Sequence, residues 1–479
     1  MKELDPRLNI VPQNIHHIHL MGICGTAMAA MAGMLKASGY TVTGSDSGVY
    51  PPMSDFLASS GIQGASGYGP QNLTPRPDLV IVGNVITRKN PEAQGIIEAG
   101  IPYLSLPQAL AHFFISSRTS LVVAGTHGKT TTSSLLASAL HQAGLDPSFM
   151  IGGIVRDFEA NFRIGNGPYF VVEGDEYDTA FFDKGSKFLH YQPQIAIITS
   201  VEFDHADIFA DLDAIKLSFR KFVALLPKDG LLIAHMDDPN VAEVVADAPC
   251  EIQGYGFSPE LAWSLSNIRP DQELTRFKVQ HRNQDWAELA VRMPGRHNCL
   301  NSLAVTAVLH RIGLAPEQIN GCLSTFGGVK RRQEIRGIER GITVIDDFAH
   351  HPTAVRETLA ALKSAYAGRR LVTVFEPRTN SSRRSIFQQD YVSAFDAADL
   401  TLIRKPLPLA NIPEEEMFSS EQLTADLRNR GLNAFTFADT DAILAHLMTT
   451  LQKGDVVAIL SNGGFDNIHN RLLAGLRAS

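Results

Sequence analysis

Residues 122–132 read VVAGTHGKTTT, an apolar run that passes into Gly-Thr-His-Gly-Lys-Thr. This order predicts a buried strand, a glycine loop and the start of a helix, which together form a phosphate-binding loop. Gly125 and Gly128 allow backbone N–H groups to approach phosphate oxygens. Lys129 supplies positive charge to the β- and γ-phosphates, and the Thr130 hydroxyl can ligate Mg²⁺. The stretch therefore predicts that the chain binds a nucleoside triphosphate.

The loop is shorter than the usual G-x-x-x-x-G-K-[ST], because Gly125 lies only three residues before Gly128 and Val123 stands at the usual first glycine position. An ordinary strand-to-helix turn that contains Gly-Lys-Thr is the alternative, and the preceding strand and the Thr-rich helix start argue against it. The residues expected to contact the nucleotide here are Gly125, Thr126, His127, Gly128, Lys129, Thr130 and Thr131.

Length and composition predict a globular, cytoplasmic, multidomain protein. A chain of 479 residues with 44% hydrophobic residues is long enough for about three domains, each with its own core. Its formal charge of -8, without a basic face, argues against a nucleic-acid partner. The four cysteines are far apart, which is typical of reduced thiols, and the glycine-broken N-terminal apolar stretch resembles neither a signal peptide nor a membrane span. We expect a monomer or a weak dimer that does not bind membranes.

The N-terminal segment has the pattern of a strand, a helix and a second strand. An apolar run meets Gly22-x-x-Gly25 and passes into an Ala/Met-rich helix, and a second strand ends at Asp46. This resembles a dinucleotide-binding turn with its acidic residue about twenty positions later. Met28 replaces the third glycine, so a nucleotide other than NAD, or a structural unit without a ligand, is also compatible with the pattern.

We predict an α/β fold of three domains, with boundaries at polar or glycine-rich stretches. Residues 1–118 form a Rossmann-like domain, 119–328 a central P-loop ATPase-like domain with a mostly parallel sheet, and 329–479 a C-terminal Rossmann-like α/β domain. In open sheets of this kind, ligands collect at the carboxyl ends of strands.

Carboxylates and a histidine follow two central strands. Glu173 ends an apolar run and opens the acidic stretch EGDEYD, where a P-loop enzyme needs a carboxylate for Mg²⁺. The next strand leads into EFDHAD, in which His205 lies beside two aspartates, an arrangement suited to a second metal position. A solvated acidic loop and a structural histidine are the alternatives.

Later polar groups are candidates for nucleotide contacts. Asn298 and Asn301 lie near the start of a helix, where amides can cap the helix or read a base edge. Lys330 to Arg332 place three cations at a predicted domain junction, where one can reach a γ-phosphate. In DDFAHHP (346–352), adjacent histidines of an extended segment point to opposite sides, so we expect nucleotide contact rather than a shared metal ion.

Together GTHGKTTT, VEGDEYD, EFDHADIF, GRHNCLNSLAV, F-x-G-x-x-RR and DDFAHHPTA resemble, in order, the motif series of the Mur ligases across the whole chain. Five further stretches narrow the resemblance to the branch that takes a tripeptide. They are TGSDSGVYPPMSDFL, GNVITRKNP, AFFDKGSKFLHY, VFEPRTNSS and LSNGGFDNIH. The resemblance implies ligation of UDP-N-acetylmuramate to L-alanyl-γ-D-glutamyl-meso-diaminopimelate, with ATP and Mg²⁺, in peptidoglycan recycling. The alternative is the UDP-N-acetylmuramate–L-alanine ligase branch, which YPPMS and EPRTNS fit less well.

The resemblance also implies roles for individual residues. Lys129 and Thr130 would hold the triphosphate and a first Mg²⁺, Glu173 would bridge to that ion, and His205 would ligate a second Mg²⁺. Arg332 would contact the γ-phosphate. Lys129, Glu173, His205 and Arg332 are thus the expected catalytic set, and Thr130, Glu173 and His205 the expected metal ligands.

Further implied contacts involve all three domains. Asn298 and Asn301 would contact adenine, and Asp347 and His350 would approach the ATP ribose or phosphates. The residues implied at the UDP-sugar are Gly22, Gly25 and Asp46, and those implied at the tripeptide carboxylates are Arg378, Thr379 and Asn380. Several Mur ligases carry a carbamoylated lysine after the DH motif, but Phe219 occupies that position here, with Lys216 and Lys221 nearby. We therefore expect no modified lysine.

Overall fold

The computed structural model describes residues 4–49, 53–206, 208–271, 273–408 and 413–478. Residues 50–52, which belong to the YPPMS stretch, and Asp207 of the EFDHAD stretch lie outside these ranges. Among the described helices, none combines the length and the apolar character needed to cross a bilayer. The chain divides into two compact units. One comprises Met1–Ile154, Phe158–Val201 and Ile215–Gly254, and the other Val155–Asp157, Glu202–Ala214 and Tyr255–Ser479.

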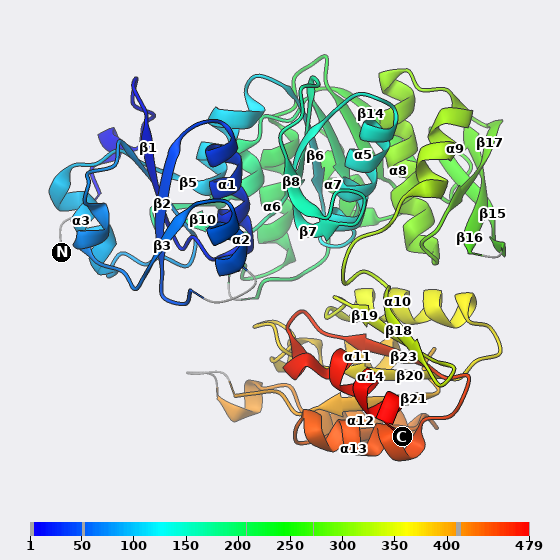
Figure 1. Cartoon of the computed structure of the whole chain (residues 1–479). Helices are drawn as coiled ribbons and strands as arrows, with labels where there is room; N and C mark the ends of the chain where they lie inside the picture. The colour runs from blue at the N-terminus through cyan, green and yellow to red at the C-terminus, as the bar shows by residue number, and fades with distance from the viewer. Residues whose placement is uncertain (1–3, 50–52, 207, 272, 409–412, 479) are drawn as a thin grey trace. The chain divides into compact units, whose positions relative to one another are not determined.

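Strands and helices mostly alternate over residues 17–142 (Figure 1), and six strands between residues 148 and 198 then precede the next α-helix. The strands are β1 His17–Met21, β2 Thr41–Asp46, β3 Gln63–Ser66, β4 Leu79–Val82, β5 Tyr103–Ser105, β6 Thr119–Ala124, β7 Ser148–Val155, β8 Ala160–Arg163, β9 Tyr169–Gly174, β10 Asp178–Ala180, β11 Asp183–Ser186, β12 Ile195–Ile198 and β13 Leu231–His235. The helices are α1 Thr26–Ala37, α2 Met53–Ser59, α3 Pro91–Ala99, α4 Leu106–Leu110, α5 Lys129–Gln142, α6 Leu212–Val223 and α7 Pro239–Val245.

The N-terminal sheet is parallel, with the strand order β3-β2-β1-β4-β5. This is the order of a Rossmann-like sheet, whose ligand crevice lies where the order reverses beside the first strand. Helix α3 lies on one side of the sheet, and α1 and α2 lie on the other (Figure 1). The sheet therefore confirms the predicted architecture and places the Gly22-x-x-Gly25 turn at the crevice.

The second sheet of the first unit carries the phosphate-loop strand at its centre. Strand β6 pairs in parallel with β12 on one side and with β9 on the other. Strand β13 extends the sheet beyond β12, and β7 extends it beyond β9, both in parallel. All four residues Leu121 to Ala124 are buried, as expected for a central strand covered on both faces.

Ten strands and seven helices follow residue 250 in the described part of the chain. The strands are β14 Glu251–Gly256, β15 Trp263–Asp271, β16 Leu274–His281, β17 Gln284–Val291, β18 Glu334–Glu339, β19 Ile342–Asp347, β20 Leu371–Phe375, β21 Leu400–Arg404, β22 Ala434–Phe437 and β23 Val456–Leu460. The helices are α8 Arg296–Ile312, α9 Pro316–Thr325, α10 Pro352–Ala365, α11 Asp390–Ala394, α12 Ser420–Asn429, α13 Thr440–Thr450 and α14 Ile468–Ala478.

After residue 250, three antiparallel pairs of consecutive strands in the described ranges add to the predicted parallel pattern. Strands β15, β16 and β17 form an antiparallel meander, and β18 pairs antiparallel with β19. The β16–β17 turn is Arg282-Asn283 and the β18–β19 turn is Arg340-Gly341, and all four residues have positive φ. Two-residue turns with this conformation match the twist of paired strands, which explains the tight reversals.

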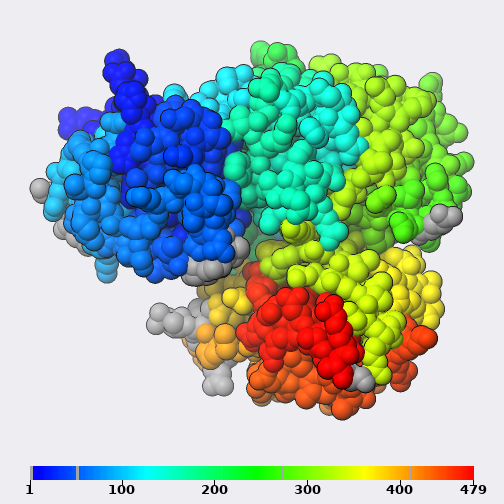
Figure 2. Space-filling model, viewed as in Figure 1, coloured from blue at the N-terminus to red at the C-terminus, as the bar shows by residue number. Residues whose placement is uncertain are grey.

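The C-terminal sheet has the order β18-β19-β23-β20-β21-β22, and every pair beyond β18 is parallel. Alternate residues of its strands face two separate hydrophobic clusters, because successive side chains of a strand point to opposite faces. In Figure 2 the red atoms, which belong to the last residues of the chain and include α14, lie at the surface of this part. The C-terminal α/β architecture is therefore also as predicted.

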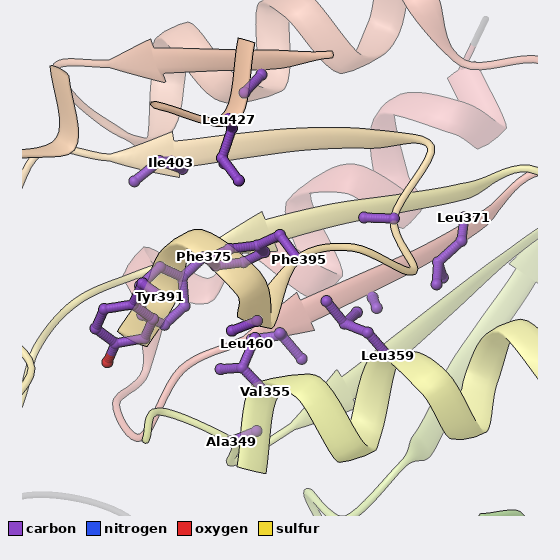
Figure 3. Packing of buried hydrophobic residues seen from close by; sticks show 14 of the residues in the cluster. Ala349, Val355, Leu359, Leu371, Phe375, Tyr391, Phe395, Ile403, Leu427 and Leu460 are labelled. Atoms are coloured by element: carbon purple, nitrogen blue, oxygen red, sulfur yellow. The ribbon is translucent and has the colours of Figure 1, made fainter. Parts of the chain in front are cut away.

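One of these clusters packs α10 and α11 on the sheet. The rings of Phe375, Tyr391 and Phe395 lie side by side (Figure 3), with centroids 5.1 Å apart for Phe375 and Tyr391 and 5.5 Å apart for Phe375 and Phe395. Val355 and Leu359 of α10 are 0% exposed in the same cluster. These contacts fix the strand ends that carry the polar residues of the C-terminal part.

We expect Leu359→Ala to destabilise the protein by about 2–5 kcal/mol, because it leaves a cavity in this cluster. Leu407→Ala is the matched control, since Leu407 is 64% exposed. Urea unfolding followed by circular dichroism measures both changes. Equal decreases in the free energy of unfolding for the two variants would contradict the packing of Leu359 in this cluster.

Candidate active site

The predicted phosphate loop lies between the end of β6 and the start of α5, and neighbouring backbone fixes it. The Thr126 N–H donates to the Ser200 carbonyl at 2.9 Å, and the His127 N–H donates to Ser200 Oγ at 3.0 Å. Thr199 Oγ1 donates to the His127 carbonyl at 2.5 Å. Gly125 has φ +136°, and a Cβ there would lie 2.0 Å from Thr199 Oγ1. The glycine is therefore required by both conformation and space.

Lys129 lies in the loop with its ammonium directed at carbonyl and carboxylate oxygens. Its Nζ donates to the Gly125 carbonyl at 2.7 Å and to Glu176 Oε2 at 3.0 Å, and Asp175 lies 4.0 Å away. Burial lowers the pKa of Lys129, but Glu176 and Asp175 outweigh that effect and hold the pKa above its ordinary value. The ammonium is therefore charged at neutral pH and available to phosphate oxygens.

Glu173 lies beside the first turn of α5. Parallel pairing places Val123 of β6 opposite Glu173 of β9, so the carboxylate reaches the strand end that carries the loop. Thr130 Oγ1 donates to Glu173 Oε2 at 3.2 Å, and the Gly152 N–H donates to Glu173 Oε1 at 2.7 Å. Two of the three predicted metal ligands, Thr130 and Glu173, are thus in direct contact.

This donor set fits a phosphate chain with a hard cation. Gly128 is the N-cap of α5 with φ +81° and gives the first turn no side-chain acceptor, a role that a phosphate oxygen can fill. A hydroxyl and a carboxylate in contact provide the oxygen ligands that Mg²⁺ prefers. The residues present therefore fit a nucleoside triphosphate and one Mg²⁺.

The N-terminal turn is held by its predicted acidic residue. The Cys24 N–H donates to Asp46 Oδ2 at 2.9 Å, and the Gly48 N–H donates to Asp46 Oδ1 at 3.1 Å. Gly22 has φ +82° and donates its N–H to the Ser45 carbonyl at 2.8 Å. Asp46 thus shapes the turn by accepting from its backbone, a role that the ribose-contact pattern alone does not reveal.

In the second unit, the two predicted adenine residues form one buried chain of amides. Asn301 Nδ2 donates to Asn298 Oδ1 at 3.4 Å. Asn298 Nδ2 donates to the Pro294 carbonyl at 2.8 Å and to Gln333 Oε1 at 3.3 Å. Asn298 therefore hydrogen-bonds a backbone carbonyl just before α8. Gln333, which the sequence analysis did not single out, extends this row of amides.

Gln333 links these amides to Asp347. Its N–H donates to Asp347 Oδ2 at 2.8 Å, and its own φ is +50°. The Gln333 Nε2 atom is buried and has no hydrogen-bond partner among the described residues. Asp347 also accepts the Ala349 N–H at 2.8 Å. Burial raises the pKa of Asp347, and Arg332 opposes that rise. The structure thus brings Asn298, Asn301, Arg332 and Asp347 together, as expected for contacts to one ligand.

Phe348 and the two histidines after it complete this region. The Arg332 guanidinium lies 4.9 Å from the centre of the Phe348 ring, which is cation–π range. His350 Nδ1 lies 3.0 Å from the Phe348 carbonyl, and the His350 carbonyl accepts from the Tyr391 hydroxyl. His350 therefore lies with its ring turned to its own loop.

His205, the third predicted metal ligand, has φ +54° and donates its N–H to Asp204 Oδ1 at 2.7 Å. Burial raises the pKa of Asp204, but His205, His350 and His351 outweigh it and bring the pKa to about 2. His205 thus contacts the Asp204 carboxylate through its backbone N–H, and the charges of His350 and His351 also act on that carboxylate within the second unit.

The predicted peptide-contact residues follow β20. Arg378 is half-exposed, and its Nη1 lies 4.0 Å from Glu376 Oε2. Thr379 Oγ1 donates to Ser382 Oγ at 2.8 Å, and Asn380 Oδ1 accepts from Arg383 Nη2 at 3.4 Å. Arg378 thus presents charge at the strand end, while Thr379 holds the local turn.

Phe219 of α6 occupies the position that aligns with the carbamoylated lysine of some Mur ligases, and Lys216 lies nearby on the same helix. Phe219 is 0% exposed and packs on Phe188, with ring centroids 5.4 Å apart. Lys216 Nζ pairs with Glu243 Oε2 at 2.6 Å. The absence of a modified lysine stays a prediction.

The chain matches three family models along its length. They are "Mur ligase family, catalytic domain" over residues 17–118, "Mur ligase middle domain" over 123–309 and "Mur ligase, glutamate ligase domain" over 331–463.

Individual relatives cover nearly the whole chain. The chain is 40% identical over 460 residues to the UDP-N-acetylmuramate–L-alanyl-γ-D-glutamyl-meso-2,6-diaminoheptandioate ligase of Escherichia coli (strain K12), covering 96% of this chain and 98% of the relative. It is 34% identical to a UDP-N-acetylmuramate–L-alanine ligase of Geobacter sulfurreducens, covering 96% and 98%. A murein peptide ligase crystal structure from Psychrobacter arcticus superposes with a TM-score of 0.71 at 36% identity, covering 97% of this chain and 99% of that one.

We expect Lys129→Ala to weaken nucleoside triphosphate binding by at least about tenfold, because it removes a charge-assisted contact. Lys184→Ala is the matched control, since Lys184 is 69% exposed and its Nζ pairs with Asp178 Oδ2 at 2.6 Å. Titration with a fluorescent ATP analogue measures both dissociation constants. Unchanged affinity in Lys129→Ala would contradict the assignment of the loop.

Proposed function

The chain belongs to the Mur ligase family, and we propose that it joins UDP-N-acetylmuramate to the tripeptide L-alanyl-γ-D-glutamyl-meso-diaminopimelate with cleavage of ATP to ADP and phosphate. The observation that carries the proposal is the contact set of Lys129, Thr130 and Glu173 at one strand edge. The tripeptide as acceptor is supported by the 40% identity to the relative of that name, against 34% to the L-alanine ligase. Recycling of peptidoglycan peptides is the role that this reaction supports.

ATP and Mg²⁺ are part of the proposal. Lys129 and the α5 N-terminus would hold the β- and γ-phosphates, and Thr130 and Glu173 would hold Mg²⁺. Bound Mg²⁺ would neutralise charge on the transferred phosphoryl group. In the second unit, Asn298, Asn301 and Asp347 would contact the nucleoside, and His205 would ligate a second Mg²⁺. We also propose His350 as a nucleotide contact.

The chemistry begins with activation of a carboxylate. An amine does not displace oxygen from an anionic carboxylate, because that oxygen is a poor leaving group. Transfer of the γ-phosphoryl group to the lactyl carboxylate of muramic acid gives an acyl phosphate and ADP. The alanine amine of the tripeptide then attacks the acyl carbon, phosphate leaves with one carboxylate oxygen, and a proton is released. Lys129 and Arg332 would stabilise the negative charge of the transferred group.

Residues that would bind the UDP-sugar and the tripeptide are assigned from their charge and their position in the fold. Gly22, Gly25 and Asp46 would form the uridine-nucleotide turn, and Arg378, with Thr379 and Asn380 beside it, would receive tripeptide carboxylates. We also propose domain boundaries at 118/119 and 328/329. The protein would be cytoplasmic and monomeric or weakly dimeric, and it would bind neither nucleic acid nor membranes.

We expect ligation with the tripeptide and not with free L-alanine. Purified protein is incubated with ATP, Mg²⁺, UDP-N-acetylmuramate and either acceptor, and phosphate release is followed together with the mass of the UDP product. Chelation of Mg²⁺ should abolish both signals. Product with free L-alanine alone would assign the L-alanine ligase activity, and no UDP-linked product with either acceptor would refute the proposal.

A further inference from the structure

Glu92 is a buried carboxylate that the proposed reaction does not use. It lies in the first turn of α3 and is 0% exposed, and its partner His19 is 1% exposed. His19 Nε2 lies 2.8 Å and Ser45 Oγ lies 2.5 Å from Glu92 Oε1. The Gly69 N–H donates to Oε2 at 3.0 Å, and Asn72 Nδ2 donates to Oε2 at 2.6 Å. Both oxygens of the carboxylate are therefore occupied by donors.

The environment favours the ionised form of Glu92. Burial raises its pKa, but the hydrogen bonds from His19, Ser45, Gly69 and Asn72 outweigh that effect and lower the pKa below its ordinary value. The helix N-terminus adds a favourable dipole. An ionised carboxylate is also the one side-chain state that accepts at both oxygens and donates nothing, so an amide cannot satisfy the same four partners.

Three of the four donors, Ser45, Gly69 and Asn72, lie in segments that build the proposed uridine pocket. Ser45 is the residue before the last one of β2, and its carbonyl accepts the N–H groups of Gly22 at 2.8 Å and Ile23 at 3.1 Å. Gly69 and Asn72 belong to residues 67–72, named the 67–72 loop, whose last three residues start the 3₁₀ helix Pro70–Leu73. Asn72 Nδ2 also donates to the Gly67 carbonyl at 2.9 Å. The single carboxylate thus joins the Gly22 turn to this loop.

The loop brings Tyr68 to the turn. Burial raises the pKa of the Tyr68 hydroxyl, and the neighbouring Asp46 carboxylate adds to that rise. A Cβ placed on Gly22 would lie 4.0 Å from the Tyr68 hydroxyl oxygen. Displacement of the loop would therefore move a polar group at the edge of the Gly22 and Asp46 turn.

We propose that Glu92 is a positioning residue of the uridine-nucleotide pocket, which fixes the Gly22 turn through Ser45 and the 67–72 loop through Gly69 and Asn72, and so sets the affinity for the UDP-sugar. This inference rests on the proposed function. A carboxylate that served the core alone would have partners unrelated to the pocket, whereas three of these four partners shape it.

The test compares UDP-N-acetylmuramate binding by calorimetry in wild-type protein, Glu92→Gln and Asn72→Ser. We expect Kd for the UDP-sugar to rise about tenfold or more in Glu92→Gln and about three- to tenfold in Asn72→Ser, since buried hydrogen bonds to a charge are lost. The affinity for ATP and the kcat at saturating UDP-sugar should stay within about twofold. Asn72→Ser keeps the test decisive if Glu92→Gln does not fold.

Asp455→Asn is the matched control, because Asp455 is a buried carboxylate in the second unit that pairs with Arg370 at 2.6 Å. It should lower the melting temperature without changing the UDP-sugar Kd. Tyr68→Phe alone should raise the UDP-sugar Kd. The same substitution added to Glu92→Gln should raise that Kd little further. Lowered melting temperatures with unchanged Kd in both pocket variants would overturn this inference alone. A wild type that does not bind UDP-N-acetylmuramate would overturn the proposed function and the inference with it.

Discussion

The parallel pairing of β6 with β9 and β12 is the constraint on which the candidate active site depends. Pairing of Ala124 with Gly174 and with Ile198 ends the three strands at the same level. The phosphate loop, the Glu173 carboxylate and the Thr199–Ser200 backbone therefore meet without a long-range adjustment of any one of them. The lysine and the threonine of the loop need only the first turn of α5 to reach that edge.

Lysines of this site pair with carboxylates of the same strand edge. Lys129 pairs with Glu176, and Asp175 is shared between Lys129 and Lys187, whose Nζ lies 3.6 Å from it. A triphosphate with Mg²⁺ brings both signs of charge, so it can replace these pairings without leaving a buried charge unpaired. Glu92 is another buried charge with polar partners. Hydrogen bonds from three segments of the proposed pocket offset the cost of burying its carboxylate.

Sequence reasoning succeeded where local pattern and chemistry coincide. GTHGKT predicted the strand, loop and helix of residues 119–142, and the apolar runs predicted the parallel sheets. It did not predict the antiparallel strand pairs, and at the β16–β17 turn Arg282-Asn283 lacks the glycine that usually marks such a turn. Glu176 and Gln333 were not singled out because their partners are distant in sequence. Asp46 and Thr379 hold turns through hydrogen bonds that only the tertiary structure reveals, and their contacts with substrates stay predictions.

The central claim is that phosphoryl transfer to a carboxylate precedes amide formation. It is tested most directly with UDP-N-acetylmuramate labelled with ¹⁸O in the lactyl carboxylate, together with ATP, Mg²⁺ and the tripeptide. Mass analysis of the released phosphate reports the fate of the labelled oxygen. Our account predicts one ¹⁸O atom in each phosphate, because the acyl phosphate loses that oxygen when the amine attacks. Phosphate without the label beside a normally formed UDP-peptide product would contradict it.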